Sequence, residues 1–116
     1  MPVDPTDPPV PLRPPVFHIL LALTKADLHG LGIADEVDRA TDGTVELGPG
    51  TLYRSLKEMT ERDLVREVDA PVEDADPRRK YYRVTDRGRE LVAAEAARLE
   101  RLVRIARERA LIPETA

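Results

Sequence analysis

Two basic side chains, Arg54 and Lys57, lie one helical turn apart in a segment whose apolar residues recur at helical spacing. A helix over this segment turns its apolar residues to one side and places both cations on the other, together with Gly50 and Glu61. Arg and Lys on the N-terminal half of such a helix can donate hydrogen bonds to guanine O6 and N7 in a DNA major groove. The alternative is a solvated helix face on which Glu58 and Glu61 neutralise the two cations. The first interpretation predicts that Arg54 and Lys57 recognise DNA bases.

A second basic cluster, Arg78-Arg79-Lys80, precedes two tyrosines in a segment that alternates like a β-strand. Although the formal net charge of the chain is −4, residues 78–89 hold six basic side chains and one acidic one. Such a local field can neutralise DNA phosphates beside a groove. Because successive strand residues face opposite sides, at least one of Tyr81 and Tyr82 is expected to pack inward. Arg78, Arg79 and Lys80 are therefore predicted phosphate contacts.

The loop before this cluster is acidic. Its four carboxylates belong to Asp69, Glu73, Asp74 and Asp76. A loop tip placed against the DNA backbone would bring them against like charge. We therefore expect the tip to point away from DNA or to stay mobile, while the basic residues hold the backbone from the base of the hairpin. The alternative is that the acids pair with Arg78 and Arg79 in the free protein.

The chain offers little for catalysis or metal binding. It has no cysteine, which excludes disulfides, thiolate zinc sites and a Cys nucleophile. His18 and His29 are not in a metal-ligand spacing, and no serine lies in a nucleophile motif. The longest apolar run, Ile19 to Leu23, is too short to span a membrane, and the N-terminus does not look like a signal peptide. We expect a cytoplasmic protein that is not an enzyme and needs no cofactor or metal.

The elements that position these residues follow from hydrophobic periodicity. Helices are predicted from Val16 to Leu23, through Ile33, Val37 and Ala40, from Gly48 to Asp63, and from Thr85 to about Arg109. Short strands are predicted from Thr44 to Leu47, Leu64 to Val68, and Lys80 to Val84. This order is mainly α with a small β-hairpin wing, a winged helix-turn-helix with an added C-terminal helix.

The last predicted helix carries a heptad pattern. Thr85 is a plausible N-cap, and the seam consists of Val92, Ala96, Leu99, Val103 and Ala106. Seven of the eleven prolines fall in the first fifteen residues, which favours an extended arm. The predicted organisation is an arm at 1–15, a DNA-binding domain at 16–85, a dimerisation helix at 86–110 and a tail at 111–116.

Three motifs resemble the signature of PadR-like transcriptional regulators. They are Gly50-Thr51-Leu52-Tyr53, Arg78-Arg79-Lys80-Tyr81-Tyr82 and Val84-Thr85-Asp86-Arg87-Gly88, preceded by His29-Gly30. The resemblance implies a homodimeric repressor that binds an inverted-repeat operator in double-stranded DNA and dimerises through its last helix. It adds Gly50, Thr51 and Tyr53 to the expected DNA-binding residues, and it implies that a small-molecule effector modulates operator affinity.

Two positions depart from the family pattern. Asp63 stands where the family commonly has glycine, and aspartate tolerates the left-handed conformation that such a turn requires. Leu31 stands where an aromatic residue is frequent, which argues against a pocket that stacks on an aromatic effector. The net negative charge supports an alternative function, a winged-helix module that binds protein and not DNA.

Overall fold

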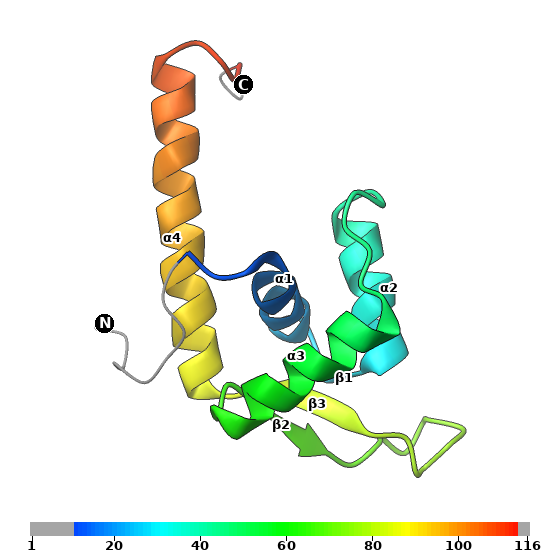
Figure 1. Cartoon of the computed structure of the whole chain (residues 1–116). Helices are drawn as coiled ribbons and strands as arrows, with labels where there is room; N and C mark the ends of the chain where they lie inside the picture. The colour runs from blue at the N-terminus through cyan, green and yellow to red at the C-terminus, as the bar shows by residue number, and fades with distance from the viewer. Residues whose placement is uncertain (1–10, 114–116) are drawn as a thin grey trace.

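The computed structural model describes residues 11–113 as four helices and a three-stranded antiparallel sheet (Figure 1). The elements are α1 (Pro14–Leu23), β1 (Leu28–His29), α2 (Gly30–Ala40), α3 (Pro49–Glu61), β2 (Val65–Val68), β3 (Tyr81–Val84) and α4 (Asp86–Glu108). This arrangement confirms the predicted winged helix-turn-helix with a long C-terminal helix.

Helix α1 lies at the centre of the fold and packs against α2, α3 and α4. It is apolar on almost every side, and Ile19 and Leu20 have no exposed surface. The helix begins two residues before the predicted start because Pro14 and Pro15 occupy its first turn, where the missing N–H groups have no partner to lose. The preceding Leu12 is also buried. Residues 1–10 of the predicted arm lie outside the described residues.

The sheet has the order β1-β3-β2. Val65 pairs with Val84 across β2 and β3, while Leu28 pairs with Tyr82 across β1 and β3. The strand predicted from Thr44 to Leu47 is wrong, because this segment is irregular.

The error has a physical cause. Val45 and Leu47 alternate because both pack partly against the core, not because they face a partner strand. The second edge of β3 is occupied by β1. With two residues, this strand is too short to show the alternating pattern of a β-strand.

The turn between α3 and β2 contains Asp63 at φ 59°, as its position predicts. Thr85 is the N-cap of α4, also as predicted: its hydroxyl accepts the N–H of Gly88 at 3.0 Å. A Cβ on Gly88 would lie 2.1 Å from the carbonyl oxygen of Leu64. The start of α4 therefore rests directly on the backbone that leads into β2, and only glycine allows this approach.

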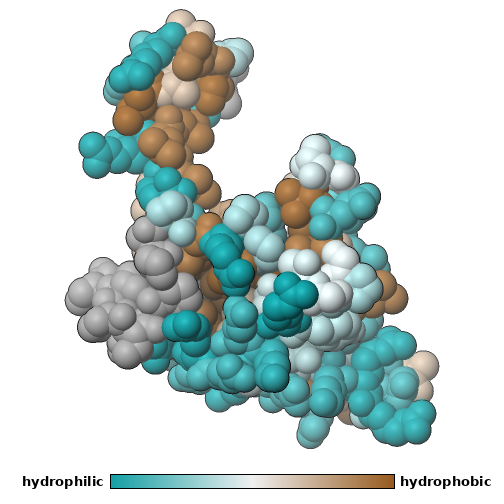
Figure 2. Space-filling view, in the orientation of Figure 1, coloured by the Kyte–Doolittle hydropathy of each residue, from teal (hydrophilic) through white to brown (hydrophobic). Residues whose placement is uncertain are grey.

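Helix α4 is buried over its first turns and then projects beyond the other helices (Figure 1). Leu91 and Val92 join the core, whereas Leu102 and Val103 are exposed. Figure 2 shows apolar surface along the projecting part of α4, in contrast to the hydrophilic surface over α3 and the hairpin.

Candidate nucleic-acid interface

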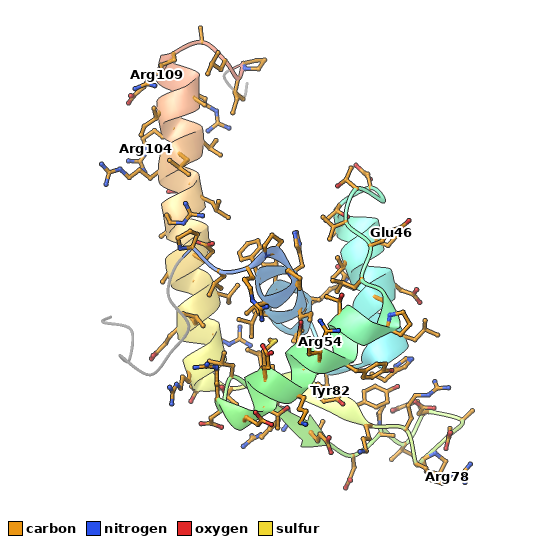
Figure 3. The ribbon with its side chains drawn as sticks, in the orientation of Figure 1. Glu46, Arg54, Arg78, Tyr82, Arg104 and Arg109 are labelled. Carbon is orange, nitrogen blue, oxygen red and sulfur yellow. The ribbon has the colours of Figure 1, made fainter. Side chains whose placement is uncertain are left out.

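The face of α3 that points away from the core carries Lys57 and Arg54, both exposed, and Arg54 is labelled in Figure 3. Neither side chain has an ion pair within residues 11–113. Glu58, a predicted neutralising neighbour, instead pairs with Nη2 of Arg13 at 2.8 Å. The two cations therefore keep their hydrogen-bond donors available to a ligand.

Gly50 and Thr51 are exposed in the first turn of α3, so nothing bulky shields the N-terminus of the helix. Tyr53 lies on the side of α3 that faces α2 and is 53% exposed. Its hydroxyl lies against Gly30, at 2.3 Å from the position that a Cβ there would take. Tyr53 thus joins the N-terminus of α2 to α3, and a side chain on Gly30 would require the Tyr53 ring to move.

The base of the hairpin loop presents the second basic cluster. Each cation has an acidic neighbour: Arg78 lies 3.4 Å from Asp76, Arg79 lies 3.7 Å from Asp74, and Lys80 lies 3.8 Å from Glu67. Asp74 and Asp76 thus lie beside the two arginines, as the alternative interpretation of the acidic loop predicts for the free protein. All three pairs are long and their cations are exposed, so each contributes little to stability and leaves donors free.

Asp74 differs from the other acids of the loop because its side chain is only 4% exposed. It accepts the Tyr81 hydroxyl at 2.6 Å and the amide N–H of Asp76 at 2.8 Å. The Tyr81 hydrogen bond, with the Asp76 amide, lowers the pKa of Asp74 below its ordinary value. The same hydrogen bond raises the pKa of Tyr81. Asp74 therefore anchors the loop, whereas Asp69 and Glu73 are exposed.

The two tyrosines of β3 face opposite sides, as predicted. Tyr82 is buried between β3 and α3, and this burial raises its pKa. Tyr81 packs its ring against that of His29, with 5.2 Å between the ring centroids. Nδ1 of His29 is buried without a hydrogen-bond partner in the described part of the chain.

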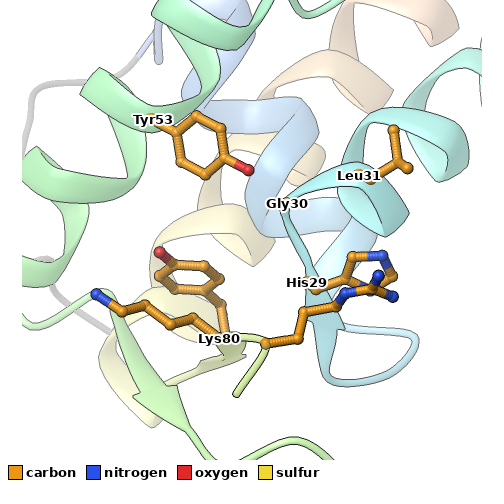
Figure 4. A pocket seen from close by; sticks show the side chains of 7 residues that line it. His29, Gly30, Leu31, Tyr53 and Lys80 are labelled. Atoms are coloured by element: carbon orange, nitrogen blue, oxygen red, sulfur yellow. The ribbon is translucent and has the colours of Figure 1, made fainter. Parts of the chain in front are cut away.

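A hollow of about 340 Å³ lies between the N-terminus of α2, α3 and β3 (Figure 4). Its lining residues are His29, Gly30, Leu31, Tyr53, Arg79, Lys80 and Tyr82. Three of them, Tyr53, Arg79 and Lys80, are predicted DNA-binding residues. His29, Gly30 and Leu31 were not assigned to a site from the sequence, because the hollow forms only when three distant segments meet. The signals for them were the His29-Gly30 match to the family signature and the position of Leu31, where the family often has an aromatic residue.

The predicted dimerisation seam divides between two environments. Val92 is buried in the protomer's own core. The other four residues lie along the remainder of α4, with Ala96 and Val103 exposed and Leu99 and Ala106 partly buried. Leu102, next to the seam, is also exposed.

Within residues 11–113 no three His, Asp or Glu side chains converge as metal ligands. No helix in this range combines the length and the apolar character needed to cross a membrane.

The chain has relatives in sequence. It matches the model of the transcriptional regulator PadR-like family over residues 19–94. A Streptomyces fradiae protein, described as an uncharacterized 37.1 kDa protein in transposon TN4556, is 34% identical over 84 residues. The match covers 72% of this chain and 22% of that protein, so the chain spans about a fifth of its length.

The fold also has solved counterparts. A PadR family transcription regulator from Clostridium difficile R20291 superimposes with a TM-score of 0.68 and 24% identity, over 81% of this chain and 95% of that one. Bacillus subtilis PadR, solved in complex with operator DNA, gives a TM-score of 0.61 and 21% identity. That match covers 72% of this chain and 47% of the other. At these identities the likeness concerns the fold.

Proposed function

The chain belongs to the PadR-like family of transcriptional regulators, and from this premise we propose that it binds double-stranded DNA sequence-specifically. The observation that carries the proposal is the exposed face of α3, where Arg54 and Lys57 have no ion pair within residues 11–113. With α3 in the major groove, these two side chains reach base edges. Gly50, Thr51 and Tyr53 belong to the same interface.

The base of the hairpin supplies the sequence-independent part of the affinity. Arg78, Arg79 and Lys80 are exposed beside α3, and their long ion pairs are readily exchanged for DNA phosphates. Phosphate contacts set the position of a protein on the duplex, while contacts to base edges select the sequence. The two basic clusters thus have separate tasks.

The bound species in this proposal is a homodimer. Residues 16–85 form the DNA-binding domain, and residues 86–110 form the dimerisation helix, whose exposed apolar residues a second copy covers. Since Val92 is already buried in its own core, the seam between copies consists of Ala96, Leu99, Val103 and Ala106. Two recognition helices related by a two-fold axis bind half-sites about 34 Å apart, so the operator is an inverted repeat.

The proposal includes repression as the mode of regulation, with release of the operator by a small effector and with action in the cytoplasm. Repression and release by an effector follow from the family alone, and action in the cytoplasm is the expectation drawn from the sequence. No pocket within residues 11–113 is assigned to an effector.

Selection of bound sites from random duplex DNA tests the proposal. We expect one enriched inverted repeat, bound with an affinity that falls steeply as salt rises, because phosphate contacts release counterions. Recovery of no enriched sequence, or an interaction that persists at high salt with a protein partner, would instead favour the protein-binding alternative that the net charge of −4 suggests.

A further inference from the structure

We propose that Arg13 determines the sequence specificity of the recognition helix α3 by holding Glu58 away from Arg54. The inference rests on the proposed function, in which Arg54 reads a base from the outer face of α3. It assigns a role to a residue that lies outside α3 and is not among the DNA-binding residues predicted from the sequence. Arg13 is thus a positioning residue, which acts on DNA only through the side chain of Arg54.

The first argument is that Glu58 and Arg54 lie within reach of each other on α3. They are four residues apart, and side chains at this spacing are neighbours on the surface of a helix. Each Cβ of a helix is tilted toward the N-terminus, so the side chain of Glu58 leans over the turn that holds Arg54. The helix dipole favours the same direction, because a carboxylate is more stable away from the C-terminal end. Without another partner, Glu58 would pair with Arg54.

The second argument is that the structure shows Glu58 with a different partner. Nη2 of Arg13 donates to Oε2 of Glu58 at 2.8 Å, whereas Arg54 has no ion pair within residues 11–113. The guanidinium of Arg54 extends toward the start of α3, where its Nη2 lies 4.0 Å from the position that a Cβ on Gly50 would take. Arg54 therefore points toward the N-terminal half of the helix, the part that reads bases in a major groove.

The third argument is that the backbone of Arg13 is fixed on both sides. The preceding Leu12 is buried, and its N–H donates to the buried Glu95 at 2.8 Å. Arg13 itself is the N-cap residue of α1, and its carbonyl accepts the N–H of Phe17 at 3.1 Å. Exposed ion pairs are usually weak because ordering the groups that form them costs entropy. Here the backbone that carries the guanidinium is already ordered, so forming the pair requires no ordering of the chain.

Loss of the pair between Arg13 and Glu58 affects specificity more than general affinity. A guanidinium that must leave a carboxylate before it donates to guanine O6 and N7 binds the base more weakly. Contacts to phosphates do not involve Arg54, so complexes with other sequences are not weakened in this way. An ion pair between residues four apart on a helix corresponds to a factor of about two in binding, or about three- to fivefold over the two half-sites of an operator.

A double-mutant cycle tests the role of Arg13. Operators recovered by selection are compared with the same duplexes changed at the base pair whose preference Arg54→Ala relaxes, and the ratio of the two dissociation constants measures discrimination. Arg13→Ala should lower this ratio about three- to fivefold. In the Glu58→Gln background, Arg13→Ala should leave the ratio unchanged, because no carboxylate is present to capture Arg54. A ratio that Arg13→Ala does not lower, or lowers equally in both backgrounds, would overturn the proposal.

Two variants serve as matched controls, and circular dichroism verifies the fold of each protein. Glu61→Gln removes a carboxylate from the same helix, and in this background Arg13→Ala should lower the ratio as it does in the wild type. If Glu61→Gln abolished the effect, the general charge of α3 would set the ratio, and the proposal would be overturned. Arg66→Ala removes an exposed cation from β2. Its effect on the ratio should be the same in the wild-type and Glu58→Gln backgrounds.

Spectra of the free protein separate failure of this inference from failure of the proposed function. In nitrogen–proton correlation spectra of the arginine side chains, Glu58→Gln should shift the Arg13 signal of the wild type and leave that of Arg54 unchanged. In Arg13→Ala, the same substitution should shift the Arg54 signal. Pairing of Glu58 with Arg62, one turn further on, would leave the Arg54 signal unchanged and would overturn the inference. Absence of an enriched operator would instead overturn the proposed function, and the role of Arg13 in specificity would fall with it even if the spectra show the change of partner.

Discussion

At the scale of single residues, the structure separates side chains of the same type by their partners. Arg54 belongs to α3 and Arg13 lies against it, yet Arg13 is held by Glu58 at 2.8 Å while Arg54 has no ion pair within residues 11–113. Asp74 and Glu73 are neighbours in an acidic loop, yet only Asp74 is buried and hydrogen-bonded. These partners decide which of the charges are free to bind.

The difference between base reading and phosphate contact is testable at Arg54 and Arg79. Arg54→Ala should relax the preference at one operator position and weaken operator binding by about 1–3 kcal/mol, with little change on random DNA. Arg79→Ala should weaken operator and random DNA alike and reduce the salt slope by about one unit. Titrations of both duplexes over a salt series measure this, with Arg66→Ala as the control. Equal losses on both duplexes for Arg54→Ala would contradict its assignment.

The anchoring role of Asp74 predicts a change at Tyr81. A hydrogen bond donated to a carboxylate stabilises the protonated phenol, which is why the pKa of Tyr81 is raised. Asp74→Asn removes the charge and should lower this pKa toward the ordinary value of 10. Absorbance of tyrosinate during alkaline titration measures the shift. Glu73→Gln, in the same loop but exposed, should leave the tyrosine titration unchanged. An equally large shift of the Tyr81 pKa in this variant would mean that the overall negative charge of the loop, and not the hydrogen bond to Asp74, raises it.

At the scale of elements, junctions hold the recognition helix and the projecting helix in place. The backbone N–H of Leu12 donates to Oε2 of Glu95 at 2.8 Å, and Arg98 donates to the same carboxylate. The next residue, Arg13, reaches Glu58 on α3. Two consecutive residues before α1 therefore connect the recognition helix with α4.

The junction between α4 and β2 predicts opposite signs at two glycines. Gly88→Ala should destabilise the fold by about 1–3 kcal/mol, because its Cβ would collide with the Leu64 carbonyl 2.1 Å away. Gly50→Ala should stabilise it by roughly 0.5–1 kcal/mol, since its Cβ would meet nothing closer than Arg54 at 4.0 Å within a helix. Denaturant unfolding gives both values. Equal stability of the two variants would mean that α4 does not rest on β2 in solution.

Glu95 makes the same region sensitive to acid. Its pKa is lowered by the hydrogen bonds from Arg98 and from the Leu12 amide, which favour the charged form despite burial. A lowered pKa means that the stabilisation is complete above the ordinary value of 4.5 and is lost as the pH falls through the folded-state pKa. Glu95→Gln should therefore flatten the loss of stability below about pH 4.5. Glu100→Gln, at an exposed position of the same helix, should follow the wild-type profile.

An element can be predicted from the sequence when the residues that produce it are close together in the chain. Helices α2, α3 and α4 were predicted from a regular apolar period and α1 from an almost unbroken apolar segment, and the left-handed turn at Asp63 was predicted because the family commonly has glycine there. Strand β1 was missed because two residues show no period. The buried charge of Glu95 and the hollow beside Tyr53 depend on contacts between segments distant in the sequence, which periodicity does not report.

At the scale of the whole molecule, the proposed dimer explains a helix that would otherwise project into water. The part of α4 beyond Arg98 holds exposed apolar residues, among them Leu102 and Val103. Burial of this surface against a second copy would also fix the distance between the two recognition helices, and hence the spacing of the half-sites.

Removal of residues 99–116 should leave a folded monomer, because Glu95, Arg98 and all residues of the core are retained. Its specific affinity for the operator should be largely lost, since only one half-site is bound at a time. Sedimentation gives the oligomeric state and circular dichroism verifies the fold. Removal of 111–116 alone is the control and should leave a dimer. A truncated protein that still sediments as a dimer would show that α4 does not hold the copies together.

The projecting end of α4 has a consequence for the exchange of backbone hydrogens with solvent. Beyond Arg98 it is about 15 Å of helix that projects past the other helices (Figure 1), and isolated helices of fewer than roughly 12 residues are only marginally stable in water. In the monomer its amides should exchange within seconds, whereas those around Leu91, packed in the core, exchange only when the domain opens. In a dimer the projecting amides are protected as well. The ratio of the two exchange rates would therefore report the fraction of paired molecules, and it should rise and fall with protein concentration.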